Sequence, residues 1–242
     1  MRATKDLADA VIIHHYPQHS GEENDQALLA SPQSLDEIIP SVRRQIKEAG
    51  GSSREYGIWL TEWNSVDFKP GPQTLSLVNG LFVADYLGML ARHNIEHASY
   101  WDIHNNLTEQ GGDYGYLSRT GAPDGDIVPR PSYHAFKLAS EGLRGRLAGC
   151  AVQSADPDAE TDLSCYLTER PDGTRSILLI NKHPLTTAAV TLAVPGLKGN
   201  GVIKRLDSAN AKTGPGKGET VLLSESLKLM IPAHSAVTIS QN

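Results

Sequence analysis

The sequence predicts an α/β region followed by an all-β region, and two observations support this. Up to about residue 145, short apolar runs alternate with stretches of helical periodicity, and such strand–helix units imply parallel strands with right-handed crossovers. From about residue 146, short alternating runs replace the helical pattern, which predicts a small antiparallel β-sandwich. A length of 242 residues accommodates both parts. We therefore expect two domains, at 1–145 and 146–242.

The α/β region should contain three strands and three helices. Val11, Ile12 and Ile13 form a short apolar run that suits a strand buried on both faces. The first helix has two possible starts: a capping box at Ser34, in which case Pro40 kinks the helix, or Pro40 itself. In either case Gly50 should end it. The expected strands lie within 8–17, 56–64 and 97–105, and the expected helices within 34–50, 74–94 and 131–143. The helix at 74–94 is apolar on most of its surface, so it should be covered on more than one side.

The β region should contain seven short strands. They are expected at 163–169, 174–181, 187–194, 202–206, 220–223, 227–231 and 236–240. Residues 171–173 (Pro-Asp-Gly) are a hairpin turn signal. Only a short connection, 143–149, joins the two regions, so we expect them to pack together, with the last strand returning to the junction.

Composition excludes some functions and leaves the location open. The formal net charge is −6 and no run of Lys or Arg exceeds two residues, which disfavours nucleic-acid or anionic-membrane binding. No apolar stretch approaches the ~20 residues of a membrane span. Residues 1–10 do not look like a signal peptide, so we expect a cytoplasmic protein, or a secreted one whose N-terminus is truncated. Cys150 and Cys165 fit either a disulfide or two reduced thiols.

Polar and aromatic side chains gather where the three parallel strands end. The first strand ends in 14–17 (His-His-Tyr-Pro), the second in 61–64 (Thr-Glu-Trp-Asn), and the third runs through 100–106. A carboxylate such as Glu62 is costly to desolvate there unless it is paired or functional. Aromatic rings beside it can stack on sugars, and the Tyr16 phenol can orient Glu62 as a nucleophile. The pattern favours chemistry at a glycosidic bond.

Other residues at these strand ends allow two interpretations each. His14 shares a face with Tyr16 and is a candidate for the site, whereas His15 points the other way and should be structural. Trp101 either lines a sugar site or packs in the core. Asn64 and His104 are weaker candidates for substrate binding.

The remaining acids are less specific. Asp102 and Asp113 bind substrate hydroxyls or lie in solvated turns, and Glu22, Glu23 and Glu109 are expected to be solvated. We expect no metal, because the adjacent histidines have no further ligand at a suitable spacing.

Taken in order, these segments resemble a known family of enzymes. The chain is similar to the α-L-arabinofuranosidases and related β-xylosidases of the large retaining clan built on (β/α)8 TIM barrels. The resemblance rests on 14–16 (His-His-Tyr), 61–64 (Thr-Glu-Trp-Asn), 101–105 (Trp-Asp-Ile-His-Asn), 112–118 and 129–133. It implies barrel strands 6, 7 and 8 followed by a β-sandwich, with Glu62 as the nucleophile, a carbohydrate substrate and no cofactor.

One departure from the family is large. The family's acid/base glutamate follows an asparagine at the end of strand 4, and no such pair precedes the first strand here. The resemblance therefore implies a fragment that lacks strands 1 to 5, is inactive alone and has the missing N-terminal barrel half as its partner. The alternatives are a β-xylosidase, a non-catalytic carbohydrate-binding fragment, or a truncated product without a stable function.

Overall fold

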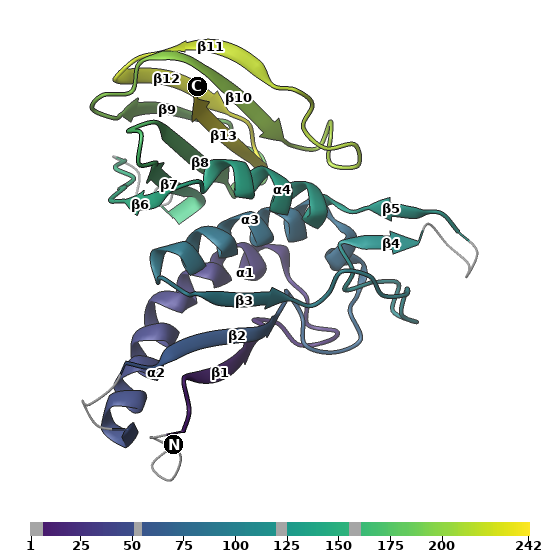
Figure 1. Cartoon of the computed structure of the whole chain (residues 1–242). Helices are drawn as coiled ribbons and strands as arrows, with labels where there is room; N and C mark the ends of the chain where they lie inside the picture. The colour runs from purple at the N-terminus through teal and green to yellow at the C-terminus, as the bar shows by residue number, and fades with distance from the viewer. Residues whose placement is uncertain (1–6, 51–54, 120–124, 155–160) are drawn as a thin grey trace.

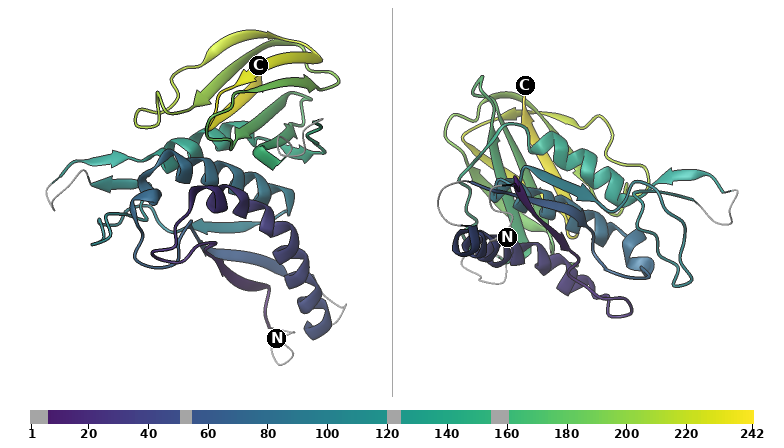
Figure 2. Two further views of the ribbon diagram at one scale, coloured as in Figure 1. Left: turned by 180° about the vertical axis from the view of Figure 1, so that it is seen from behind. Right: turned by 60° about the horizontal axis from the view of Figure 1, so that its bottom comes forward.

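The protein has three layers, seen in a computed structural model that describes residues 7–50, 55–119, 125–154 and 161–242. A parallel sheet forms one outer layer, helices form the middle layer, and antiparallel strands form the other outer layer (Figure 1). The view from behind shows the same stacking, with the helices between the two β layers (Figure 2, left). None of the helices in the described ranges is long and apolar enough to cross a bilayer.

The parallel layer is a three-stranded sheet in the order β1-β2-β3. Its strands are β1 (Ala10–His15), β2 (Gly57–Trp63) and β3 (His97–Tyr100). The expected parallel pairing is confirmed, but β3 ends at Tyr100 instead of extending to residue 105. Beyond that point the backbone bonds elsewhere: the Asp102 N–H donates to Tyr114 O at 3.4 Å. The strands in the described part of the chain do not close into a barrel.

The parallel sheet is covered on one face only. Leu60 and Trp63 are fully buried against the helices, whereas Ile12 is 57% exposed and Trp59 is 38% exposed on the opposite face. The expectation that the first strand is buried on both faces is therefore wrong. The apolar run around Ile12 is compatible with two buried faces, but no described segment packs on the second face.

Helical segments of the described residues form the middle layer. They are α1 (Asp25–Ala30), η2 (Ser31–Ser34), α2 (Leu35–Gly50), η3 (Pro72–Leu75), α3 (Leu77–Arg92) and α4 (Pro131–Gly142). Pro40 lies inside α2, and α2 ends at Gly50 as expected. The expected Ser34 cap does not form, because α2 continues directly from η2, and the Ser34 hydroxyl is buried with no partner among the described residues. Buried residues occupy 12 of the 16 positions of α3, which confirms its expected cover on several sides.

The β region contains a six-stranded antiparallel sheet and a two-stranded one. The first has the order β11-β10-β13-β8-β7-β6 and the second pairs β12 with β9. The bounds are β6 (Arg146–Ala148), β7 (Leu163–Glu169), β8 (Arg175–Asn181), β9 (Ala188–Ala193), β10 (Gly199–Leu206), β11 (Glu219–Leu223), β12 (Ser226–Ile231) and β13 (Ser235–Gln241). All seven expected strands are present. The sequence analysis missed β6 and the short hairpin of β4 (Leu117–Arg119) and β5 (Ile127–Pro129).

The β region packs firmly on the helices, as the short connection predicts. Leu178 and Ile180 of β8 belong to the cluster that also holds residues of α3 and α4, and Ala236 of β13 joins them. A Cβ on Gly142, the last residue of α4, would lie 2.8 Å from Thr238 of β13, so the expected return of the last strand is confirmed. A disulfide joins Cys150 to Cys165.

Candidate functional site

A tyrosine and a glutamate meet at the ends of two adjacent parallel strands. The Tyr16 hydroxyl donates a hydrogen bond to Glu62 Oε2 at 3.0 Å. Tyr16 follows β1, while Glu62 is the penultimate residue of β2, and its side chain is 32% exposed. Burial and the hydrogen bond to Glu62 raise the pKa of the Tyr16 phenol. Tyr16 therefore stays protonated and remains a donor at any ordinary pH.

A bulge in β2 aims Glu62 at this edge. The β1–β2 register pairs Ile13 with Leu60 but then pairs His14 with Glu62, so Thr61 is an extra residue. By strict alternation Glu62 would face the helices, as Leu60 does. The bulge breaks the alternation, and Trp63 becomes the next residue packed in the core.

The two adjacent histidines point in different directions, as expected. His14 Nδ1 lies 3.6 Å from Glu62 Oε2, and His14 Nε2 lies 3.0 Å from Thr61 Oγ1. His15 stacks on Tyr86 of α3, with Nδ1 2.8 Å from the Tyr86 hydroxyl. Burial lowers the pKa of His15, so it is neutral and structural. His14 is thus the histidine that reaches the glutamate.

Asn64 is turned into the protein and holds the segment that follows β3. Its side chain is fully buried, and its amide NH2 donates to the backbone oxygens of Trp101 and Tyr114. Its amide oxygen accepts the Ser65 N–H at 2.7 Å. These bonds to the protein make Asn64 a support for the Trp101 backbone.

Trp101 and His104 lie on the segment after β3 and are exposed. Trp101 has 42% of its surface exposed, and its N–H donates to Trp63 O at 3.0 Å, which anchors it beside the end of β2. His104 forms an isolated bridge with Leu117. Among the described residues, His104 makes no hydrogen bond or ion pair with Glu62. The structure therefore brings Tyr16 and His14 to Glu62, with the Trp101 backbone bonded to the end of β2.

Two more side chains near Tyr16 are Tyr114, which the sequence did not single out, and Asp102, whose role the sequence left open. Burial, and then the nearby Asp67, Asp102 and Glu23, raise the pKa of Tyr114 to about 12. Burial also raises the pKa of Asp102, whose Oδ1 is buried without a partner in the described part of the chain. Tyr114 lies in a Gly-rich loop and belongs to no strand, so only its aromatic character could have marked it.

Two acids are bound to the protein: Glu23, which was expected to be solvated, and Asp113, which was expected to bind substrate hydroxyls or to lie in a solvated turn. Glu23 accepts the backbone N–H of Gly71 at 2.8 Å and that of Gly21 at 2.9 Å, so its expected solvation is wrong. It holds the loop before η3. Asp113 is buried and accepts the Ser118 hydroxyl at 2.6 Å and the Gly115 N–H at 2.7 Å. These acids shape loops beside the site.

The site lies at an open sheet edge. Three cavities lie along the helices and the β region, and Glu62 lines none of them. In the described ranges, no group of three or more His, Cys, Asp or Glu side chains is placed to hold a metal ion. The chemistry available at this edge is that of one carboxylate with a phenol donor and aromatic neighbours.

The fold is similar to those of solved glycoside hydrolases. No sequence model of a known family and no curated protein sequence matches the chain. Solved structures do match: one is a family 44 endoglucanase produced by Clostridium acetobutylium ATCC 824, with a TM-score of 0.69 and 19% identity over 99% of this chain and 49% of that one. Such a likeness shows a glycosidase-like fold.

Within this class, the chain is similar to α-L-arabinofuranosidases. The enzyme from Thermotoga maritima, solved as an arabinose complex, has a TM-score of 0.76 and 18% identity over 98% of this chain and 53% of that one. The family GH51 enzyme from Thermotoga petrophila RKU-1 has a TM-score of 0.76 and 17% identity, with the same coverage of 98% and 53%. The chain thus spans about half the length of the solved structures that it resembles.

Proposed function

We propose that this chain carries the nucleophile side of a retaining glycosidase site. The observation that carries the proposal is the 3.0 Å hydrogen bond from Tyr16 to Glu62 at the ends of neighbouring parallel strands. In retaining hydrolysis, a carboxylate attacks the anomeric carbon as the leaving oxygen is protonated, and water then cleaves the glycosyl ester. Glu62 is the attacking carboxylate in this proposal.

The contacts of Glu62 favour attack by one of its two oxygens. Tyr16 donates to Oε2, and His14 lies 3.6 Å from the same atom. Oε1 has no hydrogen-bond partner among the described residues. Tyr16 therefore orients the carboxylate and leaves Oε1 available for the bond to carbon.

The proposed sugar contacts are Trp101, His14 and His104. Trp101 is 42% exposed beside the end of β2 and offers an apolar ring to the face of a sugar. Asn64, expected to bind substrate, would instead act through the Trp101 backbone that it holds. The proposed substrate is an arabinofuranosyl residue of a plant-type polysaccharide, which the two arabinofuranosidase folds support. A β-xyloside is the alternative within the class.

The proposed site needs a second carboxyl group from outside the described strands. Retaining enzymes place the two carboxyl groups about 5–5.5 Å apart. In the proposal, β1, β2 and β3 correspond to strands 6, 7 and 8 of a (β/α)8 barrel within 1–145, with 146–242 as the sandwich domain. The missing N-terminal half of the barrel would pair with the free edge of β1 and supply the acid/base. The sheet's uncovered face, with Ile12 57% exposed, supports such a partner.

A non-catalytic carbohydrate-binding fragment is the second candidate. It is favoured by two exposed tryptophans, Trp59 at 38% and Trp101 at 42%, whose rings can stack on sugars. Such a fragment would bind sugar without cleaving it.

Covalent labelling separates the two candidates. A mechanism-based arabinofuranoside whose leaving group departs without protonation needs only the nucleophile, so the absent acid does not matter. Mass spectrometry should find one sugar on Glu62, none in Glu62→Gln, and normal labelling in Glu109→Gln, which changes an exposed loop glutamate. A matching xyloside tests the alternative sugar. Saturable binding without a label would favour the binding fragment, and a label on another residue would overturn the assignment of Glu62.

A further inference from the structure

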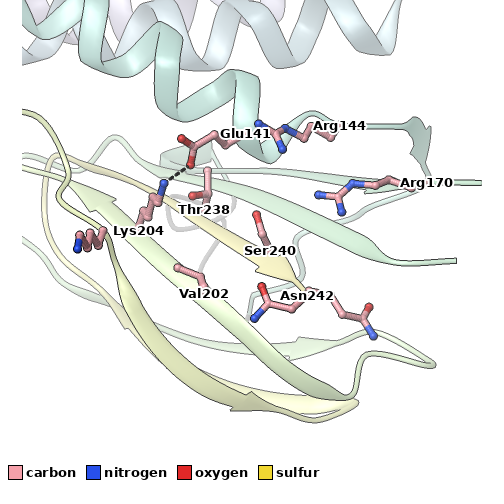
Figure 3. Close-up of a pocket in the computed structure, with 10 residues that line it drawn as sticks. Glu141, Arg144, Arg170, Val202, Lys204, Thr238, Ser240 and Asn242 are labelled. Atoms are coloured by element: carbon pink, nitrogen blue, oxygen red, sulfur yellow. Dashed lines mark hydrogen bonds and ion pairs between the residues drawn. The ribbon is translucent and has the colours of Figure 1, made fainter. Parts of the chain in front are cut away.

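A pocket that Glu62 does not line lies where the end of α4 meets the six-stranded sheet. Its volume is about 390 Å³, and it is lined by α4, the turn after β7, and strands β10 and β13 (Figure 3). That volume is near the lower end of the ~300–1,000 Å³ range of small-molecule sites. Thr238 and Ser240 contribute hydroxyl groups, and Val202 is its one aliphatic side chain.

The charge of this pocket is opposite to that of the chain. Four cationic side chains line it (Arg144, Arg170, Lys204 and Lys217), against one carboxylate side chain, Glu141. The chain as a whole has 28 acidic and 22 basic residues, so a local excess of cations is not a consequence of composition. Clustered charge of one sign in a concave surface attracts ions of the other sign.

Most of these cations have no counter-ion among the described residues. Glu141 forms an ion pair with Lys204, whose Nζ lies 2.7 Å from Glu141 Oε2. Among the described residues, the Arg170 guanidinium donates only to the neutral hydroxyls of Thr174 and Ser176, at 3.2 and 3.4 Å. Arg144 and Lys217 form neither a hydrogen bond nor an ion pair with any described residue. Figure 3 shows the guanidinium groups of Arg144 and Arg170 turned into the pocket.

We propose that this pocket binds a monosaccharide-sized molecule through a phosphate or carboxylate group. Two guanidinium groups, held on the segment after α4 and the turn after β7, suit an anion with several oxygens, because each can donate two parallel hydrogen bonds. The seryl and threonyl hydroxyls beside them suit the remaining polar atoms of a sugar. A simpler role for Arg144, as a cation near the negative end of α4, would need no ligand.

Calorimetric titration of the 242-residue chain at low salt tests the proposal. Inorganic phosphate or glucuronate should bind saturably, and neutral glucose should not. Arg144→Gln and Arg170→Gln should each weaken that binding roughly tenfold, the effect of losing one charge-assisted hydrogen bond. Arg146→Gln is the matched control, because Arg146 is an exposed neighbour that does not line the pocket. The preference between phosphate and glucuronate identifies the ligand as phosphorylated or as an acidic sugar.

Three outcomes would overturn this site. They are the absence of saturable binding by both anions, binding of glucose as tight as that of glucuronate, and equal weakening by Arg146→Gln and Arg144→Gln. Far-UV circular dichroism of each variant establishes that its fold is retained, and these exposed or partly exposed side chains carry little of the core.

Discussion

Strands β8 and β1 show how differently the two sheets are buried. On β8, Leu178 and Ile180 face the helices, while Ile177 and Leu179 face the cluster shared with the two-stranded sheet. On β1, Ile13 packs toward the helices, but Ile12 is 57% exposed on the other face. Both strands carry a continuous apolar run, so the difference lies in what covers them.

This comparison places stability and function in different parts of the molecule. The helices and the six-stranded sheet share one core, which includes Tyr86, Tyr166 and Leu178. Buried Asp85 of α3 reinforces it by accepting the Tyr166 hydroxyl at 2.5 Å and the Ser164 hydroxyl at 3.0 Å. The proposed site lies on the sheet that is half covered. A well-packed scaffold therefore presents an edge that lacks partners.

The largest expected effect concerns turnover, and it tests whether that edge is incomplete. The isolated chain should not hydrolyse an aryl α-L-arabinofuranoside, because in the proposal the acid/base comes from another polypeptide. Co-expression with a polypeptide that supplies the missing strand–helix units should give activity. Glu62→Gln should then lower the rate by roughly 10⁴-fold or more, as expected for loss of a nucleophile. A colorimetric assay of released phenol measures both states.

Activity in the isolated chain would contradict this prediction. If that activity also disappeared in Glu62→Gln, the acid would have to lie within this chain, and Asp102, with its buried and unpartnered Oδ1, would be the first residue to examine. Glu109→Gln serves as the control for changing an exposed glutamate.

The second prediction compares the two sheets directly by their stability. Leu178→Ala removes a fully buried side chain from the shared core and should lower the free energy of unfolding by about 2–5 kcal/mol. Ile12→Thr changes an exposed strand residue while keeping a β-branched side chain, and should cost less than about 0.5 kcal/mol. Urea unfolding followed by circular dichroism gives both values. Equal costs would mean that the open face is covered in solution, for example by a second copy of the chain.

Sequence patterns predicted most of the fold because the strands and helices are strongly periodic. The mostly apolar α3 was interpreted correctly, because it is buried on several sides. The strand expected at 174–181 is present as β8, but its two buried faces were not predicted, because its sequence was interpreted as one of the short alternating runs. The same reasoning failed for Ile12, since an apolar residue shows only that burial is compatible with it. Burial depends on a neighbour, and that neighbour lies outside the sequence pattern.

The sequence predicted which residues form the site better than it predicted their contacts. Tyr16, His14 and Glu62 were recognised as residues at strand ends, and the structure places them in contact. The bulge at Thr61, which turns Glu62 away from the helices, has no signature such as a glycine. The inward direction of Asn64 follows from the loop after β3, whose backbone supplies its partners. Such long-range hydrogen bonds leave no local pattern.

The third prediction tests whether Tyr16 positions Glu62. Tyr16→Phe removes the phenol donor, so the carboxylate loses its orientation, and labelling of Glu62 by the mechanism-based arabinofuranoside should slow roughly 10- to 100-fold. Its saturation constant should change little, because the hydrogen bond is made to the nucleophile and not to the sugar. Tyr133→Phe, on α4, is the matched control. A large change in the saturation constant with an unchanged maximal rate would make Tyr16 a sugar contact instead.

The smallest expected effect is a pH dependence of stability that comes from the covered side of the parallel sheet. Burial lowers the pKa of His15 below 6.5, so the folded state prefers neutral histidine. Well above pH 6.5, His15 is neutral in both the folded and the unfolded state, so it does not lower the free energy of unfolding. As the pH falls through 6.5 toward the lowered value, the unfolded chain binds the proton more readily, and stability is lost. Burial lowers the pKa of His134 and His234 too, so part of the dependence should persist without His15.

His15→Gln should therefore flatten the decline in unfolding free energy between about pH 7 and pH 5, measured by urea titration at each pH. His19 is the opposite case, because its hydrogen bond to Asp67 raises its pKa, so the folded state prefers the charged form. His19→Gln should not flatten the decline. The contradicting result is that His19→Gln flattens the curve and His15→Gln does not. The stacked pair of His15 and Tyr86 would then open on acidification, and the covered face would be less stable than its packing indicates.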